Sequence, residues 1–516
     1  MRTFTFRYTS EDEVEKIIKN LVTNKSQSST DLPVKIIKKY SSTFSKFISN
    51  SINDSIGTKS FPDILKVADI TPVFKKKGSK SDKNNFRPIS ILPILSKIYE
   101  RVIHDQISYY FSHIFSDKKC GYRKGISTQT PLLVLEEMWK KATDEKKNFG
   151  ALLIDLSKAF DCVSHDLLIA KLEAYGLAKD AIDFVASYLS NRRQRTRIGS
   201  YYSTWHEILV GVPQGSILGP LLFNIYIRDL FYFLGENNVL NYADNTIPYA
   251  VAGSWEQLEN ELNASASIIF EWLEYNQLKG NADKSMLITN HQSKQINMTI
   301  QGERIFNCET AKILGITFDN CLNFEHHITN LCKKASQKVS ALSRIAPFMN
   351  VTKKRKLMNA FFKCHFSYCP LVWMYHTRRL EHKINHLHER CLRLVYSDNN
   401  SSFEELLEKD GAITFHQRNL QLLAIEIFKC KNNLSDLTDT IFIRDQKRIT
   451  TRQASLFKPR TIRTVYNGQE SHSFLGPKIW ELVPSEIREL NDLSVLRGKL
   501  SIGYLHHAHV ETVVST

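Results

Sequence analysis

The sharpest hydrophobic pattern in the chain is an apolar run of strand length that ends in a carboxylate. Residues 151–154 read Ala-Leu-Leu-Ile and are followed by Asp155. Four consecutive apolar residues cover both faces of a strand, so the run predicts a strand in the middle of a sheet. A carboxylate beside an apolar core needs a cationic neighbour, and a divalent metal ion is a common one next to a cleft. Taken alone, such an acid is more often the N-cap of a following helix.

A second stretch changes this interpretation because it places another acid in a predicted hairpin. Residues 239–247 read Val-Leu-Asn-Tyr-Ala-Asp-Asn-Thr-Ile, the pattern of a strand, a tight polar turn and a second strand. Asp244 lies in the turn. If the hairpin and the 151–154 strand are neighbours in one sheet, Asp155 and Asp244 converge. They can then hold the paired metal ions of a phosphoryl-transfer site.

Periodic apolar positions predict helices on both sides of this core. The spacing of Val14, Ile17, Ile18 and Leu21 predicts a helix with Ser10 as its N-cap. Similar patterns predict helices over residues 92–107, 258–273, 325–346, 403–407 and 420–428, and a partly alternating pattern predicts a strand over 67–74. Arg192, Arg193, Arg195 and Arg197 indicate a basic loop that leads into a strand.

Length and charge set the limits of this picture. At 516 residues and 42% hydrophobic content, the chain is too long for one compact core and should divide into two to four units. Its net charge of +16 favours a polyanionic partner, although a basic protein that merely stays dissolved has the same property. Pro213, Gln214 and Pro220 interrupt the longest apolar stretch, so we expect no membrane span.

Cysteines add no further chemistry. The nine cysteines include no Cys-x-x-Cys pair, which indicates reduced thiols in an intracellular chain. Cys364, His365, Cys369 and Cys391 lie close in sequence, but their spacing fits no common zinc finger. We therefore predict no zinc site.

Three motifs together carry a resemblance to a known family. Asp155 is followed by Ala-Phe-Asp at residues 159–161, residues 211–220 read Gly-Val-Pro-Gln-Gly-Ser-Ile-Leu-Gly-Pro, and residues 242–244 read Tyr-Ala-Asp. Their order and spacing resemble those of reverse transcriptases, most closely the enzymes of non-LTR (LINE-type) retrotransposons. Several separate motifs in register make a chance match very unlikely.

The resemblance, which covers roughly residues 1–400, implies an α+β fold: a right-hand polymerase with fingers, palm and thumb, followed by a mostly helical C-terminal extension. Residues 1–60 then form a helical leader to the fingers, residues 61–324 the fingers and palm, and residues 325–399 a helical, thumb-like region. Residues 400–516 form an extension whose role the sequence does not specify. Enzymes of this kind usually carry an endonuclease before the polymerase. We expect a fragment or a decayed copy, because the chain begins almost at the polymerase.

The implied activity is that of an RNA-directed DNA polymerase, a nucleotidyltransferase that adds deoxynucleoside triphosphates to a primer 3′-hydroxyl. Its implied cofactor is a pair of Mg²⁺ ions, with Mn²⁺ as a substitute, held by Asp155 and Asp244. Asn245 occupies the third catalytic position, where the family carries a second aspartate. An amide offers the metals a neutral oxygen, so we expect weakened metal binding and slow turnover. The alternative is a catalytically inactive remnant that only binds nucleic acid.

The resemblance also implies a set of nucleotide-binding residues. Arg87 matches the family's triphosphate-binding arginine, and its planar fork suits phosphate oxygens. Lys75 is one of three adjacent lysines beside it. Phe160 matches the ring that rejects a ribose 2′-hydroxyl, although a core role competes with that interpretation. The remaining positions are Gln214 and Gly215, which approach the base pair, and Lys284, which contacts the triphosphate or is an ordinary surface lysine.

Four positions are expected to contact nucleic acid. Arg123 lies in a template-contacting turn, for which a helix N-cap near Ser127 is the alternative, and Arg193 lies in the basic arginine segment. Gly315 lies in a hairpin resembling the primer grip, and Lys334 lies on the thumb helix. The expected partners are an RNA template, a DNA primer and deoxynucleoside triphosphates, with no membrane and no protein partner that the sequence identifies. The expected location is intracellular, in cytoplasm and nucleus.

Overall fold

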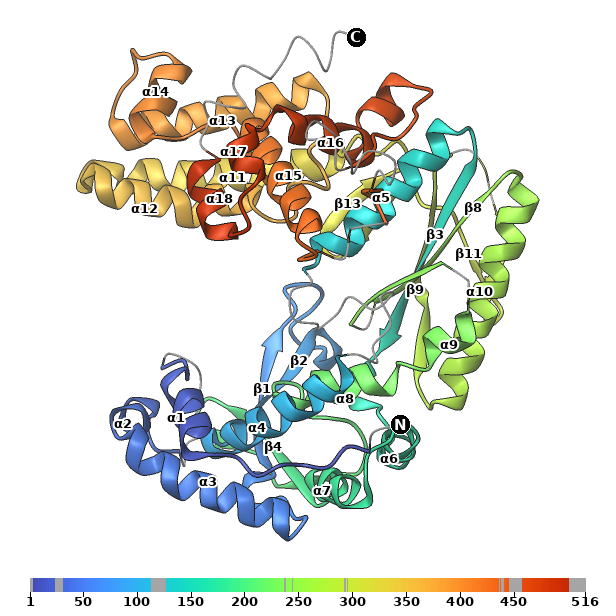
Figure 1. The fold of residues 1–516 in the computed structure, drawn as a ribbon, viewed down its shortest axis with the longest axis vertical. Coiled ribbons are helices and arrows are strands. Elements are labelled where there is room, and N and C mark those ends of the chain that lie inside the picture. The colour runs from blue at the N-terminus through green and yellow to red at the C-terminus, as the bar shows by residue number, and fades with distance from the viewer. Residues whose placement is uncertain are drawn as a thin grey trace.

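The computed structural model describes residues 3–23, 31–112, 127–235, 238–243, 245–291, 294, 296–435, 437, 440–444 and 457–500. Figure 1 shows these residues as an open arc. Helices α1 to α4 and α6 to α8, with strands β1, β2 and β4, form its lower lobe. A sheet built on β3, β8 and β9 forms the right-hand side, and helices α11 to α18 form the upper lobe together with α5.

The sheet on the right-hand side has the strand order β7-β8-β3-β9. Its strands are β7 (Val239–Tyr242), β8 (Asn245–Ala252), β3 (Asn148–Ser157) and β9 (Lys279–Thr289). Strand β3 is antiparallel to both β8 and β9, so the sequence prediction of a central strand is confirmed. We call this sheet the palm sheet.

Both faces of the palm sheet are covered by helices. Phe149 of β3 stacks on Trp139 of α5 (Gln129–Asp144), with ring centroids 4.8 Å apart. On the other face, Leu152 and Ile154 share a buried cluster with residues of α10 (Trp255–Tyr275). Burial on both faces is the reason why β3 has a continuous apolar run and not an alternating one.

The lower lobe contains a second sheet with the order β2-β1-β4-β5, in which β6 also pairs with β4. Its strands are β1 (Val67–Phe74), β2 (Phe86–Ile91), β4 (Arg192–Ile198), β5 (Tyr201–Tyr202) and β6 (His206–Ile208). We call it the fingers sheet. The expectation that the arginine segment is a loop is wrong, because these residues form strand β4. Arg192 is fully buried and donates a hydrogen bond to the Tyr188 carbonyl, and Arg195 forms an ion pair with buried Asp69, so both arginines are held within the fold.

Helices complete the lower lobe around this sheet. They are α1 (Glu11–Lys19), α2 (Val34–Lys39), α3 (Ser41–Gly57), α4 (Ile94–Phe111), α6 (His165–Ala174), α7 (Lys179–Leu189) and α8 (Leu218–Tyr226). Helix α9 (Leu230–Leu234) lies beside α10 on the right-hand side of Figure 1. Ser10 caps α1 in a capping box with Glu13, which confirms the predicted N-terminus of that helix.

The upper lobe begins after the hairpins β10 (Met298–Ile300) with β11 (Glu303–Ile305) and β12 (Thr310–Ile313) with β13 (Ile316–Asp319). Its helices are α11 (Glu325–Ile345), α12 (Val351–Phe361), α13 (Arg378–Tyr396), α14 (Phe403–Asp410), α15 (Phe415–Lys431), α16 (His472–Leu482), α17 (Ser485–Arg488) and α18 (Leu493–Lys499). Helix α11 matches the predicted thumb helix to within one residue. Helices from both sides of residue 400 share one buried apolar cluster, so the described part of the extension packs directly on the thumb-like helices.

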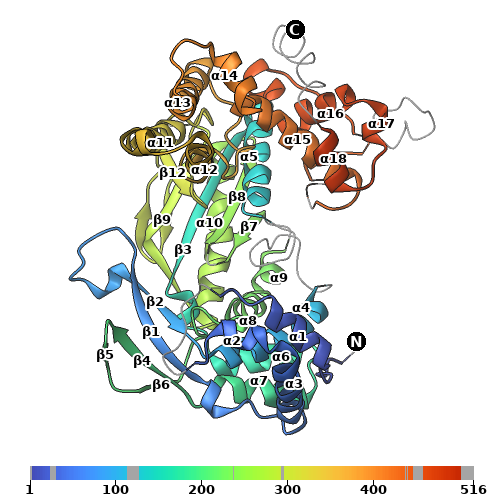
Figure 2. The ribbon, with the colours of Figure 1, turned by 90° about the vertical axis from the view of Figure 1, so that its left-hand side faces the viewer.

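A buried polar contact ties this extension to α5. The Asp144 carboxylate accepts hydrogen bonds from the backbone N–H and the hydroxyl of Thr464, at 2.8 and 2.7 Å. Glu137 accepts hydrogen bonds from the backbone N–H of His472, at 2.9 Å, and from the Ser473 hydroxyl. Figure 2 shows α5 between the palm sheet and the helices α15 to α18. We call this contact between α5 and residues 460–473 the α5 lock.

Candidate active site

Asp155 lies near the C-terminal end of β3, at the open edge of the core. Its side chain is 37% exposed, whereas its neighbours Ile154 and Leu156 are buried. The pairing of β3 with β9 shifts register between Leu153 and Asp155. Such irregularities occur at functional sites because they re-aim a side chain. The Asp155 carboxylate is therefore exposed to solvent, although the residues on either side of it are buried. Strand β3 continues beyond it to Ser157.

The predicted hairpin lies beside this point. Tyr242 pairs with Asn245 across the turn, and Thr246 pairs with Ile154 of β3. Ala243 has a left-handed backbone with φ of 59°, as a tight turn requires. Asp244 lies outside the described residues, so its convergence with Asp155 stays a prediction. Its chain neighbour Asn245 begins β8, on the strand next to Asp155.

The Asp155 carboxylate has a cationic neighbour. Lys284 of β9 places Nζ 3.4 Å from Asp155 Oδ2, and its side chain is 65% exposed. Within the described residues, this lysine is the ion-pair partner of Asp155 and no cluster of three or more acidic, histidine or cysteine side chains holds a metal. The half-exposed Asp155 carboxylate and an Asn amide on the neighbouring strand are both hard oxygen donors, which suit Mg²⁺. The donors therefore fit the implied metal.

The glycine-rich segment at residues 211–220 is fastened to the turn after β3. The Gly211 N–H donates to the Val163 carbonyl at 2.7 Å, and the Val212 N–H donates to the Phe160 carbonyl at 2.8 Å. A Cβ on Gly211, whose φ is +88°, would lie 2.7 Å from the Asp161 carbonyl oxygen. This position therefore requires glycine.

Gln214 and Gly215 connect that turn to the fingers sheet. Gln214 Nε2 donates to Asp161 Oδ1 at 2.9 Å, while the Gln214 carbonyl accepts from the Ser90 N–H at 2.7 Å. A Cβ on Gly215 would lie 2.6 Å from the Ser90 carbonyl oxygen. Desolvation raises the pKa of Asp161, and the hydrogen bond from Gln214 opposes that rise. The contacts form a continuous path from the end of β3 to β2.

Arg87 and Lys75 lie on the β1–β2 ribbon. Arg87 is an exposed residue of β2, three residues before Ser90, and pairs with Val73. Lys75 follows β1, and its Nζ donates to the Asn84 carbonyl at 2.8 Å. Arg87 therefore presents its guanidinium from the strand that the Gln214 segment contacts, whereas Lys75 supports the ribbon.

Phe160 has a packing role, and its role as a steric gate stays a prediction. Its ring stacks on Phe223 of α8, with centroids 4.7 Å apart, and it remains partly exposed. Packing against α8 fixes the ring while one part of it faces out of the core. The core interpretation and the gate interpretation are thus compatible.

The remaining predicted positions are spread over three regions. Gly315, with φ of +92°, forms the β12–β13 turn, where the Tyr368 hydroxyl donates to the Leu314 carbonyl at 2.6 Å. Leu314 lines the same small cavity as Tyr242, so this hairpin lies beside the Asn245 hairpin.

Lys334 is exposed on α11. Arg193 pairs with Val67, at the far end of β1 from Lys75, about 25 Å along the strand. Arg123 lies outside the described residues.

Sequence reasoning missed a buried residue that organises the site. Glu100 of α4 accepts hydrogen bonds from the backbone N–H groups of Ile217 and Leu218, at 2.5 and 3.2 Å. These N–H groups begin α8, where the helix dipole favours a negative charge. Burial raises the pKa of Glu100, and the charge of Arg192 opposes this rise. An acid on the apolar side of a predicted helix was the signal that could have revealed it.

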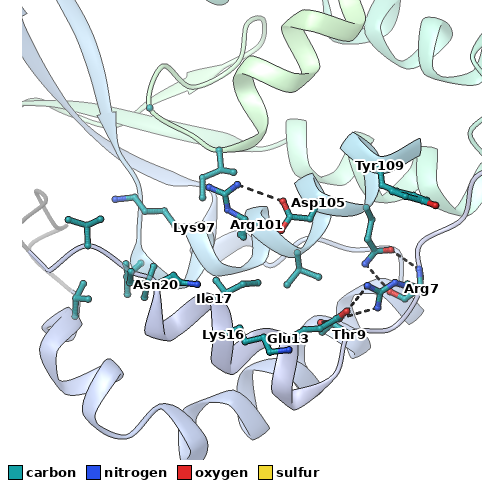
Figure 3. Close-up of a pocket in the computed structure, with 18 of the residues that line it drawn as sticks. Arg7, Thr9, Glu13, Lys16, Ile17, Asn20, Lys97, Arg101, Asp105 and Tyr109 are labelled. Atoms are coloured by element: carbon teal, nitrogen blue, oxygen red, sulfur yellow. Dashed lines mark hydrogen bonds and ion pairs between the residues drawn. The ribbon is translucent and has the colours of Figure 1, made fainter. Parts of the chain in front are cut away.

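A large cleft lies behind the glycine-rich segment. Its volume is about 1140 Å³, and its lining includes Gly215 and Ile217. Figure 3 shows Lys16, Lys97 and Arg101 among its lining side chains, with Arg101 in an ion pair with Asp105 at 3.7 Å. The cleft thus runs from a charged wall on α1 and α4, in which the acids Glu13 and Asp105 accompany the cations, to the backbone of Gly215.

Comparisons with known proteins identify the family that this chain resembles. The family model described as reverse transcriptase (RNA-dependent DNA polymerase) matches residues 74–318. A probable RNA-directed DNA polymerase from transposon BS of Drosophila melanogaster is 27% identical over 74% of this chain and 44% of its own length. The RNA-directed DNA polymerase from mobile element jockey of the same species is 27% identical over 65% of this chain and 38% of its own length. The chain therefore spans less than half the length of these relatives. Among the described residues, no helix is both long and apolar enough to cross a membrane.

Proposed function

Because residues 74–318 form a reverse transcriptase domain of the non-LTR retrotransposon type, we propose that this chain is an RNA-directed DNA polymerase that extends a DNA primer on an RNA template. One observation carries the proposal: the half-exposed Asp155 carboxylate at the end of the central strand, beside the Asn245 hairpin. A carboxylate in this position is available to a ligand, because Lys284 is its one ion-pair partner among the described residues and it remains in contact with solvent.

Asp155, Asp244 and Asn245 are the residues proposed to hold the metal. Reverse transcriptases use divalent ions, and two Mg²⁺ ions, or Mn²⁺ in their place, neutralise charge on the triphosphate during phosphoryl transfer. Lys284 keeps the Asp155 side chain oriented toward β9 and can turn its exposed ammonium group to an incoming phosphate. Asn245 supplies an oxygen but no charge, so we propose a slow enzyme.

The other predicted residues take positioning roles. Arg87 offers two parallel N–H donors to phosphate oxygens. Phe160, held by Phe223, limits the space beneath the sugar. Gln214 is held from both ends, at its side chain by Asp161 and at its carbonyl by Ser90, so Gly215 lies at a fixed place beside the nucleotide.

The cleft supports a route for the template strand. The lysines Lys16 and Lys97 in its lining and its contact with Gly215 suit a phosphodiester backbone that passes behind the glycine-rich segment. Gly315 and Lys334 are proposed to contact the primer end and the duplex, respectively. A polymerase of this kind works inside the cell, and we expect it in cytoplasm and nucleus.

Primer extension tests the proposal. We expect this protein to extend a labelled DNA primer annealed to RNA when Mg²⁺ and deoxynucleoside triphosphates are present, and to stop when the metal is chelated. Binding of the same primer–template, measured by gel shift, is recorded in parallel. Normal binding without extension in either Mg²⁺ or Mn²⁺ would establish the second candidate, an inactive remnant, which the charge lost at Asn245 favours.

A further inference from the structure

The outer edge of the fingers sheet carries a cluster of arginine and aromatic side chains that the proposed catalysis does not use. Arg195 of β4 places its guanidinium carbon 4.0 Å from the ring centroid of Tyr202 and 4.5 Å from that of Trp205. Arg197 lies 5.6 Å from the Tyr202 centroid. We call Arg195, Arg197, Tyr202 and Trp205 the Arg–aromatic platform. Figure 2 shows its strands β4 and β5 at the lower left, away from the thumb helices.

The platform is preorganised. Arg195 Nε donates to Asp69 Oδ1 at 2.8 Å, and Asp69 is 4% exposed, so this arginine is anchored from below. The two rings that contact its guanidinium are thereby held at a solvent-exposed edge, and Tyr202 and Trp205 remain 39% and 41% exposed. Rings that are fixed and still exposed lose little entropy when another planar group stacks on them.

The surrounding charge identifies the kind of ligand. Residues 66–92 and 192–208 contain eleven lysines and arginines against three acids, a net charge of +8 out of +16 for the whole chain. Half of the protein's excess charge therefore lies in these two segments of the fingers sheet, a count that includes the platform arginines and the buried Lys66 and Arg192. Exposed aromatic rings between arginines suit unpaired nucleotides, because bases stack on the rings while phosphates meet the charges. A duplex hides its base faces and leaves such rings without a partner.

The platform also shares a sheet face with Arg87. Directly paired residues lie on the same face, and the pairs Arg87 with Val73 and Asp69 with Arg195 belong to one alternation along β1. Two strand spacings and a four-residue offset separate Arg87 from Arg195 by roughly 16 Å. Arg87 and the platform therefore lie on one face of the fingers sheet, within reach of one extended strand of nucleic acid.

We propose that the Arg–aromatic platform is a second nucleic-acid site, which binds an unpaired single strand by base stacking on Tyr202 and Trp205. The site is separate from the catalytic cleft, and binding requires neither a metal ion nor nucleotides. Its failure is thus distinguishable from failure of the proposed polymerase activity.

Fluorescence anisotropy tests the site, with a labelled 12-nucleotide oligouridylate and a blunt RNA–DNA duplex as probes. We expect the double variant Y202A/W205A to bind the oligouridylate about tenfold to a hundredfold more weakly, which is the effect of losing one stacked base, and to bind the duplex as before. The Y202F/W205F variant should keep single-strand binding because it keeps two rings.

The matched control is Tyr201→Ala. Tyr201 is 81% exposed on the same hairpin, but it pairs with Ile198 on the opposite face. Unchanged oligouridylate binding by Y202A/W205A would overturn the proposal and would indicate that the two rings contact a protein instead. Equal losses in Y201A and Y202A/W205A, or equal losses for the duplex and the single strand, would overturn it as well.

Discussion

The carboxylates of α5 and the carboxylate of β3 lie in adjacent layers, and the protein treats them in opposite ways. Asp144 and Glu137 have side chains that are 2% and 3% exposed and are enclosed by hydrogen-bond donors of the extension. Asp155 is 37% exposed and has a lysine at 3.4 Å. Removing an acid from water requires several donors, so the first set is committed to structure. The second keeps its capacity to bind a ligand.

The contrast also appears between neighbouring residues of the α5 lock. Burial alone would raise the pKa of Glu137, but the hydrogen bonds and charge of His472 and the hydrogen bond from Ser473 lower it to about 2. Burial raises the pKa of Glu136 despite the nearby Lys140. One carboxylate of the pair is therefore stabilised as an anion, and its neighbour is pushed toward the neutral acid.

The largest expected effect concerns Asp155. We expect Asp155→Asn to reduce primer extension at least about a thousandfold, equivalent to about 4 kcal/mol of transition-state stabilisation, because it removes a metal-binding charge and keeps the shape. The thermal unfolding midpoint should stay within about 2 °C. Single-turnover extension and thermal melting measure the two quantities. A loss of folding stability without a specific loss of turnover would place Asp155 with the structural acids.

The reverse result is expected for Asp144. Asp144→Ala removes the acceptor of Thr464 and the partner of Arg460, whose side chain is 14% exposed. Breaking such a buried charge contact costs about 3 kcal/mol. We expect a loss of that size in unfolding free energy, and early proteolysis between residues 457 and 500. Asp144→Asn keeps one acceptor oxygen and should lose about half as much. Equal stability of all three proteins would show that the α5 lock contributes nothing.

The exposed acid at the end of β3 could be predicted from the sequence, whereas the buried acids of α5 could not. An apolar run that ends in an acid is a local pattern, and the strand it predicts is present as β3. The structural roles of Glu137 and Asp144 could not be predicted, because their partners lie more than 300 residues further along the chain. A pattern within one helix holds no information about a segment so distant in sequence.

The prediction of a loop for the arginine segment was wrong for a related reason. A dense run of arginines reads as a solvated loop, yet Arg192 is buried against the Tyr188 ring and Arg195 is held by Asp69. The helix α11, in contrast, was predicted to within one residue because its apolar stripe alone determines its limits. Local periodicity was therefore sufficient for elements that bury apolar side chains, and insufficient for those that bury charge.

A third, smaller effect is expected at the open site. Asn245→Asp restores one negative charge beside Asp155, and we expect it to raise primer extension about tenfold, since each factor of ten corresponds to about 1.4 kcal/mol. The Mg²⁺ concentration for half-maximal rate should fall, while template affinity stays unchanged. A magnesium titration of both proteins measures the change. Equal rates and equal metal dependence would show that charge at residue 245 does not limit this site.

The smallest effect concerns Glu13, an acid intermediate between the two sets. Its carboxylate receives two hydrogen bonds from Arg7, at 3.0 and 2.6 Å, and is 39% exposed at the wall of the cleft in Figure 3. The hydrogen bonds from Arg7 lower the pKa of Glu13 to about 2, against the effect of burial. Because solvent screens so exposed a pair, we expect Glu13→Gln to reduce the free energy of unfolding by less than about 1 kcal/mol at pH 7.

The pH dependence decides whether that difference comes from the charge. A lowered carboxyl pKa stabilises the fold above the unfolded value of about 4.3, and this contribution disappears as pH falls through the folded value. The difference between the wild-type protein and Glu13→Gln should therefore shrink between pH 4.5 and about 2. Denaturant titrations at several pH values measure it, with exposed Glu11→Gln from the same helical turn as the matched control. A difference that stays constant over this range would mean that Glu13 acts through packing at the capping box and not through its charge.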